Sequence, residues 1–135
     1  MSENASSNAQ TVQAMYAAFG SGDLPALLEK VTDDVEWNMS GPASVPYAGD
    51  RHGKDGVMAF FAAHAGSFKL TKFEVLSITA EGDHVAVSGY EEGEALSTGK
   101  TFANPWAMHF TFRDGKVSSF RTYEDTAALV EALTP

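Results

Sequence analysis

The amino-acid sequence predicts a cone-shaped α+β fold, in which a curved antiparallel sheet wraps around three helices from the N-terminal half and encloses an apolar cavity. Apolar residues recur at helical spacing between residues 8 and 31 and again between residues 54 and 64. From residue 68 to residue 124, apolar and polar residues alternate instead, as in strands with one buried face. Helices followed by a run of strands are typical of α+β layers. The length of 135 residues suits a single domain, which we expect over residues 8–135.

The first two helices follow from their capping residues. Residues 1–7 are polar and are expected to form a disordered tail. Ser7 and Gln10 make a capping box at the start of the first helix. One face of that helix carries Val12, Met15, Tyr16 and Phe19. After a glycine-rich turn, Asp23 is the predicted N-cap of a second helix, where Pro25 is tolerated in the first turn.

The middle of the chain combines a short strand, a long loop and a third helix. The strand spans residues 35–39 and places Trp37 and Met39 on the same side. Residues 40–51 contain prolines and glycines and form a loop long enough to rim a site. The third helix begins near Lys54. Its buried face is expected to carry Val57, Phe60, Phe61 and His64.

The C-terminal half reads as four strands and a short helix. Strands are predicted over residues 68–80 and 84–92, joined by a turn at 81–83. A hairpin follows over residues 104–124. Asp125 or Thr126 then caps the closing helix, which contains Leu129, Val130 and Leu133.

The last hairpin turns at Arg113-Asp114-Gly115, and the loop length decides its register. A two-residue loop would place Met108 opposite Arg121, whereas a three-residue loop with a left-handed Gly115 would pair Met108 with Phe120. We favour the three-residue loop because it separates a large apolar face from a mixed, more polar face. The predicted inward face contains Trp106, Met108, Phe110, Phe112, Phe120, Thr122 and Glu124. The predicted outer face contains Ala107, His109, Thr111, Val117, Ser119, Arg121 and Tyr123.

Composition narrows the classes of partner and cofactor. The formal net charge is −9 with no basic cluster, so we expect no nucleic-acid partner. There are no cysteines, and the four histidines at 52, 64, 84 and 109 are scattered, so neither a disulfide nor a metal site is expected. No phosphate-binding loop follows a strand, and we expect no cofactor. No apolar leader or membrane-spanning run is present, so we expect no membrane partner and a cytoplasmic location.

Several short sequence patterns occur together in a characteristic order. Asp33-Asp34-Val35-Glu36-Trp37 is followed by His52-Gly53-Lys54, and Asp114-Gly115-Lys116-Val117 runs into Arg121-Thr122-Tyr123-Glu124-Asp125. In this order they resemble the nuclear transport factor 2-like superfamily, in particular its SnoaL-like and ketosteroid isomerase-like branches. The resemblance covers nearly the whole chain. It implies a cystatin-like α+β roll and a homodimer packed through the sheet.

The catalytic residues of those branches match this sequence only in part. Ketosteroid isomerases place a carboxylate base where this chain has Met39, and a protonated aspartate where it has Met108. Their oxyanion-hole tyrosine corresponds to Tyr16. SnoaL-type cyclases use an aspartate where this chain has Thr122, and their accompanying histidine again corresponds to Met108. Neither reaction is therefore assigned.

Glu124 and Tyr16 are the candidate catalytic residues. An apolar surrounding would raise the pKa of Glu124 and make it a usable general acid or base, unless it lies in solvent at the strand end. Tyr16 could donate a hydrogen bond to a ligand carbonyl, or it could be a core tyrosine. The expected lining of the pocket is Trp37, Met39, Tyr47, His52, Phe61, Trp106, Met108, Phe110, Phe120 and Thr122.

Two functions remain open at this stage. The first is a SnoaL-like protein that holds a small apolar organic molecule and performs a cofactor-free isomerisation, cyclisation or hydration of a carbonyl compound. The second is a non-catalytic ligand-binding or protein-interaction module on the same fold. The missing carboxylates at positions 39 and 108 favour the second, whereas an inward Glu124 favours the first.

Overall fold

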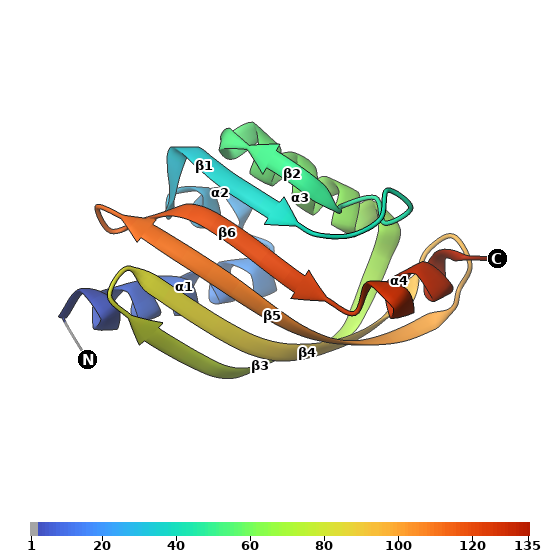
Figure 1. Ribbon diagram of the computed structural model, residues 1–135. Helices are drawn as coiled ribbons and strands as arrows, with labels where there is room; N and C mark the ends of the chain where they lie inside the picture. The colour runs from blue at the N-terminus through green and yellow to red at the C-terminus, as the bar shows by residue number, and fades with distance from the viewer. Residues whose placement is uncertain (1–2) are drawn as a thin grey trace.

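The structure, a computed structural model, describes residues 3–135 and contains a bent six-stranded sheet with helices on its concave side (Figure 1). The elements in chain order are α1 (Glu3–Gly20), α2 (Leu24–Leu28), β1 (Val31–Met39), β2 (Gly49–His52), α3 (Gly53–Ser67), β3 (Phe68–Glu81), β4 (His84–Ala95), β5 (Thr101–Arg113), β6 (Lys116–Glu124) and α4 (Thr126–Leu133). The strand order is β2-β1-β6-β5-β4-β3. The predicted α+β cone is confirmed.

The sheet is mixed, which qualifies the antiparallel sheet that was predicted. β1 pairs with β6 in parallel, while the other neighbouring strands are antiparallel. The parallel pair is possible because α3 and four strands, β2 to β5, lie between β1 and β6 in the chain. β2 was not predicted, because residues 49–52 lack the apolar alternation of a strand and pair at an edge of the sheet.

The N-terminal helix begins at Glu3, so the disordered tail predicted for residues 1–7 is wrong over the described part of the chain. Residues 1 and 2 lie outside the described residues. Ala5 is fully buried, and the Asn8 side chain donates a hydrogen bond to the Gly82 carbonyl at 3.4 Å. These tertiary contacts stabilise a first turn whose own serines and asparagines are weak helix formers.

The last hairpin has a two-residue turn, so the three-residue loop was the wrong choice. Arg113 pairs with Lys116, and both Asp114 and Gly115 have positive φ, at 53° and 80°. This is the pattern of a type I′ turn, whose twist matches that of the strands. A bulge at Ser118 then shifts the register. Beyond it the pairs are Thr111–Ser119, Phe110–Phe120, Met108–Thr122 and Trp106–Glu124.

The predicted faces of this hairpin nevertheless hold, with one exception. The observed register beyond the bulge differs from the predicted one by two residues, and a shift of two leaves side chains on the same face. Val117 is the exception. It lies between the turn and the bulge, pairs with Phe112 and is fully buried.

The caps predicted for the short helices are confirmed. The Asp23 carboxylate accepts a hydrogen bond from the Ala26 amide, and the Asp125 carboxylate accepts one from the Ala128 amide. The helix that Asp125 caps packs at the end of β4 and β5 (Figure 1). Among the described residues, no helix is both long enough and apolar enough to cross a membrane.

Candidate functional site

A cavity of about 60 Å³ lies between the helices and the concave face of the sheet. Its wall combines side chains from α1, α2, α3, the loop before β2, and five strands of the sheet, β1 and β3 to β6. Eight predicted site residues contribute to this wall: Tyr16, Trp37, Tyr47, Phe61, Met108, Phe110, Phe120 and Glu124. The other lining residues were not predicted from the sequence: Met15, Phe19, Leu27, Phe60, His64, Phe73 and Glu91.

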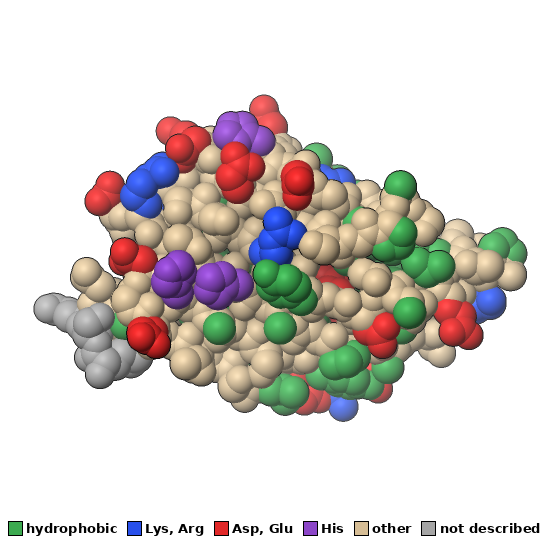
Figure 2. Space-filling view, viewed as in Figure 1, with side chains coloured by type: hydrophobic (Ala, Val, Ile, Leu, Met, Phe, Trp, Pro, Cys, Tyr) green, Lys and Arg blue, Asp and Glu red, His purple; other side chains and the backbone are tan. Residues whose placement is uncertain are grey.

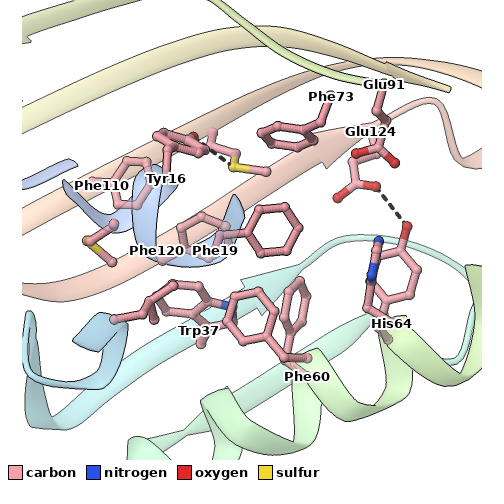
Figure 3. Close-up of a pocket in the computed structure, with 15 residues that line it drawn as sticks. Tyr16, Phe19, Trp37, Phe60, His64, Phe73, Glu91, Phe110, Phe120 and Glu124 are labelled. Carbon is pink, nitrogen blue, oxygen red and sulfur yellow. Dashed lines mark hydrogen bonds between the residues drawn. The ribbon is translucent and has the colours of Figure 1, made fainter. Parts of the chain in front are cut away.

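Aromatic rings form most of the wall (Figure 3). Trp37 stacks on Phe120 with the ring centres 3.9 Å apart, and Phe60 meets Trp37 edge to face at 6.0 Å. Phe110 also packs edge to face on Phe120, at 5.1 Å. Such rings bury a large apolar area at fixed geometry, so this wall suits a flat apolar ligand.

Glu124 reaches into the cavity, as predicted, and its carboxylate is held by three hydrogen bonds. The Tyr47 hydroxyl donates to Oε1 at 2.9 Å, the Asn104 amide donates to the same oxygen at 3.1 Å, and the Thr122 hydroxyl donates to Oε2 at 2.9 Å. Burial raises the pKa of Glu124 above its ordinary value, while the three donors act in the opposite direction by favouring the charged form.

Glu91 on β4 is a second carboxyl group at the same end of the cavity (Figure 3). It is only 4 % exposed, and its Oε2 has no hydrogen-bond partner among the described residues. Burial, followed by the nearby charge of Glu124, raises the pKa of Glu91 to about 8. Glu91 was missed, although the alternation of Val85, Val87 and Gly89 continues to this position and predicts an inward side chain.

Asn104 bridges the strands that carry the two carboxyl groups. It is fully buried on β5, directly opposite Glu91 on β4. Its Oδ1 accepts a hydrogen bond from the Asp125 amide at 2.8 Å, which directs its NH₂ group toward Glu124. Its hydrogen bond with Glu91 also lowers the pKa of that residue, against the larger effect of burial. The donors around Glu124 favour its charged form, so the first negative charge of this pair is better placed on Glu124 than on Glu91.

Tyr47 and His64 complete the polar end of the cavity as neutral groups. Burial, and then the charge of Glu124, raises the pKa of Tyr47 far above its usual range, so its hydroxyl remains a donor. Burial lowers the pKa of His64 to about 4, so the ring is neutral at pH 7. The two rings meet edge to face with their centres 4.9 Å apart.

Tyr16 lines the cavity away from the two carboxyl groups (Figure 3). Its hydroxyl donates to Met108 Sδ at 3.0 Å, and its ring stacks on Trp106 at 5.9 Å. Burial raises the pKa of Tyr16 well above its ordinary value. Because a thioether is a weak acceptor, a ligand oxygen could replace the sulfur as the partner of this hydroxyl.

Four of the predicted lining residues do not contribute to the cavity wall. Met39 is buried in the core, and Trp106 packs behind Tyr16. Thr122 is fully buried and acts through its hydrogen bond to Glu124. The His52 side chain is 68 % exposed and contacts Glu36 at 2.6 Å, at the start of α3. Alternation alone could not separate side chains that face the cavity from those that fill the core around it.

Comparison with known proteins establishes the family. A model of the SnoaL-like domain family matches residues 12–120. The chain therefore belongs to the SnoaL-like family, within the nuclear transport factor 2-like superfamily, as a small-molecule-binding protein. No curated protein matches the chain.

Solved structures with this fold are numerous. An NTF2-like protein of Burkholderia xenovorans LB400 is 33 % identical, with a TM-score of 0.88 over 96 % of this chain and 98 % of that chain. An NTF2-like protein of unknown function from Burkholderia pseudomallei K96243 is 26 % identical, with a TM-score of 0.89 over the whole of both chains. TerC, crystallised with polyporic acid, is 27 % identical, with a TM-score of 0.82 over 94 % of this chain and 98 % of that chain.

Proposed function

We propose that this protein binds a small apolar carbonyl compound in the cavity and catalyses a proton transfer on it without a cofactor. One observation carries the proposal: Glu91 and Glu124 meet at one end of an apolar cavity, and they differ in hydrogen bonding. Two titratable groups in environments that separate their pKa values are suited to act as acid and base. The relative crystallised with polyporic acid supports a small organic ligand.

In this proposal Glu124 is the base. Its carboxylate removes a proton from the carbon beside the ligand carbonyl, and the electrons of the broken C–H bond move toward the carbonyl oxygen. Protonated Glu91 donates a hydrogen bond to that oxygen and stabilises the developing negative charge. Return of the proton from Glu124 to another carbon would complete an isomerisation. The carboxyl groups at positions 91 and 124 thus replace those that are missing at positions 39 and 108.

The test begins with a thermal-shift screen against small ketones, terpenoids, steroids and aromatic polyketides. A ligand at about a hundred times its dissociation constant adds roughly 2.7 kcal/mol of stability, which raises the melting temperature by a few degrees. Each hit is then incubated with the protein in D₂O, and exchange of the protons beside the carbonyl is followed by NMR. This readout requires no knowledge of the product.

We expect Glu124→Gln to abolish the exchange while the ligand still stabilises the protein, because the amide cannot take up the proton. Glu91→Gln should slow the exchange, since it replaces an O–H donor by a weaker one. Glu94→Gln is the matched control, because Glu94 lies on the same strand and is exposed. Equal exchange by wild type and Glu124→Gln would refute the assignment of the base.

The competing function is ligand binding without chemistry. Tyr16 corresponds to the oxyanion-hole tyrosine of ketosteroid isomerases, but its hydroxyl donates to Met108 Sδ. This observation favours the competing function. It predicts stabilisation by ligands without any proton exchange. The cytoplasmic location and the homodimer packed through the sheet are part of our proposal as well.

A further inference from the structure

Trp37 brings an unused hydrogen-bond donor to the cavity wall. The residue is 2 % exposed, and its Nε1 has no acceptor among the described residues. Stacking on Phe120 at 3.9 Å fixes the plane of the indole. In Figure 3 the indole nitrogen of Trp37 points toward the interior of the ring cluster, on the opposite side of the pocket from Glu91 and Glu124.

A buried N–H group without an acceptor is costly, and tryptophan N–H groups usually find a partner when buried. The rings that pack on Trp37, those of Phe60, Phe61 and Phe120, carry no oxygen or nitrogen acceptor. No side chain or carbonyl of residues 3–135 accepts this hydrogen bond, and because Trp37 lines the cavity, a molecule bound there is placed to supply the acceptor.

Glu91, at the polar end of the cavity, needs a ligand group of its own in addition to the acceptor at Trp37. Glu91 Oε2 is also buried and has no partner in the described part of the chain, but it belongs to a different strand and a different part of the wall. A ligand with one carbonyl group satisfies either Glu91 or Trp37, and it leaves the other group unpaired. A carboxylate would fit poorly beside Glu124, because like charges repel in a buried site.

We propose that the ligand of this protein is a flat dioxygenated compound, with one carbonyl oxygen at Glu91 and Glu124 and a second acceptor oxygen at Trp37 Nε1. This inference rests on the proposed function, because it takes the Glu91 end as the site of the first carbonyl. It narrows the ligand class from apolar ketones in general to dicarbonyl and hydroxycarbonyl compounds with a rigid aromatic or conjugated frame.

The test uses matched probes that differ in the second oxygen. The meta and para isomers of diacetylbenzene carry two carbonyl groups, and the corresponding isopropylacetophenones replace one acetyl group by an apolar group of similar shape. Binding of each probe is measured to wild type, Trp37→Phe and Trp106→Phe. Trp106 is the control because its Nε1 is also buried and unpartnered but the residue does not line the cavity.

A second readout is direct. The chain has two tryptophans, so its ¹H–¹⁵N spectrum contains two indole N–H signals, which the two variants assign. We expect a diacetylbenzene to move the Trp37 signal downfield, and the matched isopropyl compound to leave it nearly unchanged. The preference for the diacetyl member of a pair should fall about 3- to 10-fold in Trp37→Phe, the range of one hydrogen bond, and persist in Trp106→Phe.

The inference is overturned if both members of each pair shift the Trp37 signal equally, or if Trp37→Phe leaves the preference intact. Exchange of the acetyl protons in D₂O that depends on Glu124 would in that case still support the proposed function. Conversely, a specific Trp37 shift without exchange supports the inference and contradicts the catalytic step. If no probe binds, the inference fails together with the binding step of the proposed function.

Discussion

Glu91 and Glu124 have opposite hydrogen-bonding environments although they are the same residue type and share one end of the cavity. Glu124 accepts three hydrogen bonds, which favour its charged form, whereas Glu91 has the hydrogen bond with Asn104 and its Oε2 has no partner among the described residues. Burial raises the pKa of both groups, so the two are separated by their hydrogen bonds and by the charge of Glu124, which raises the pKa of Glu91 further. The chemistry of this site therefore depends on Tyr47, Asn104 and Thr122 as much as on the carboxyl groups themselves.

The raised pKa of Glu91 predicts that the free energy of unfolding falls as the pH rises from 6.5 to 8. Between 4.5 and about 8 the folded protein holds a proton on Glu91 that the unfolded chain releases, so stability is lost with rising pH. The lowered pKa of His64 makes the free energy of unfolding rise with pH, but only between about pH 4 and pH 6.5. Between pH 6.5 and pH 8 the carboxyl groups therefore determine the slope. The slope contributed by Glu91 should approach about 1.4 kcal/mol per pH unit.

Urea titrations at a series of pH values measure this slope. Glu91→Gln should reduce it, because the amide does not titrate, and exposed Glu94→Gln should leave it unchanged. The raised pKa of Glu124 adds a slope of the same sign. A slope that is identical in wild type and Glu91→Gln would show that Glu91 is not the group responsible.

Gly89 allows the Trp106 ring to lie flat against β4. A Cβ at residue 89 would lie 2.0 Å from Trp106 Cζ2, so the indole must move if any side chain is introduced. We predict that Gly89→Ala lowers stability by about 1–3 kcal/mol or more, as overpacking does, and disturbs Tyr16, which stacks on Trp106. Thermal denaturation tests this.

Gly66→Ala is the matched control for Gly89→Ala. No atom of residues 3–135 lies within 4 Å of a Cβ built at residue 66, which is exposed near the end of α3. Alanine is the better helix former, so this variant should gain roughly 0.5–1 kcal/mol. Equal losses in the two variants would contradict the steric explanation.

At the scale of elements, the segment between β1 and β2 is a structured part of the site rather than a loose rim. It carries Tyr47, which is fully buried and bonded to Glu124. The Arg51 guanidinium donates to the carbonyl of Tyr47 at 2.9 Å, and to those of Pro46 and Ala48 at 3.3 Å. One side chain therefore fixes the turn that positions the Tyr47 hydroxyl.

We predict that Arg51→Met speeds hydrogen exchange of the amides in residues 45–48, because three carbonyl groups lose their donor. The hydrogen bond from the Tyr47 hydroxyl to Glu124 should also weaken. Hydrogen exchange in β4 and β5 should remain unchanged. Arg113→Met is the control, since Arg113 lies at the end of β5 and pairs with exposed Asp34. Unchanged exchange in residues 45–48 would mean that packing alone holds the segment.

For the whole molecule, the outer face of the sheet is the surface on which we expect a second copy to pack. Most of this face consists of uncharged side chains and backbone (Figure 2). Its exposed residues include Ala107 and Tyr123, the latter 52 % exposed, while His109 stacks on His84 at 5.2 Å. A large exposed aromatic side chain beside small neighbours is compatible with close packing of two sheets.

Sedimentation at micromolar concentration tests the dimer. We predict a mass of twice 14.4 kDa for wild type and a shift toward the monomer for Ala107→Arg, which introduces a charge at the centre of the outer face. Lys116→Glu, at the hairpin turn and away from that centre, should keep the dimer. A monomer mass for wild type would rule out this assembly.

The sequence predicted much of the site because period-two alternation follows from strand geometry, which is local. It placed Glu124, Met108, Phe110 and Phe120 on the inward face, and this remained true after the register proved wrong. The actual register was not predictable, because the alternation of apolar and polar residues in the hairpin does not indicate the bulge at Ser118. The same alternation also places Glu91 on the inward face. It was not predicted there because charged residues are rarely buried.

The sequence by itself determined the α+β order of elements apart from β2, the helix caps at Asp23 and Asp125, and which side of the last hairpin faces the core. All of these depend on residues that are near one another in the chain. Only the tertiary structure decided that Glu91, Asn104, Glu124 and Tyr47 meet, that β1 lies parallel to β6, and that Trp37 Nε1 has no acceptor among the described residues. These features arise from contacts between distant segments, and such contacts depend on register, sheet curvature and helix packing, which local patterns do not encode.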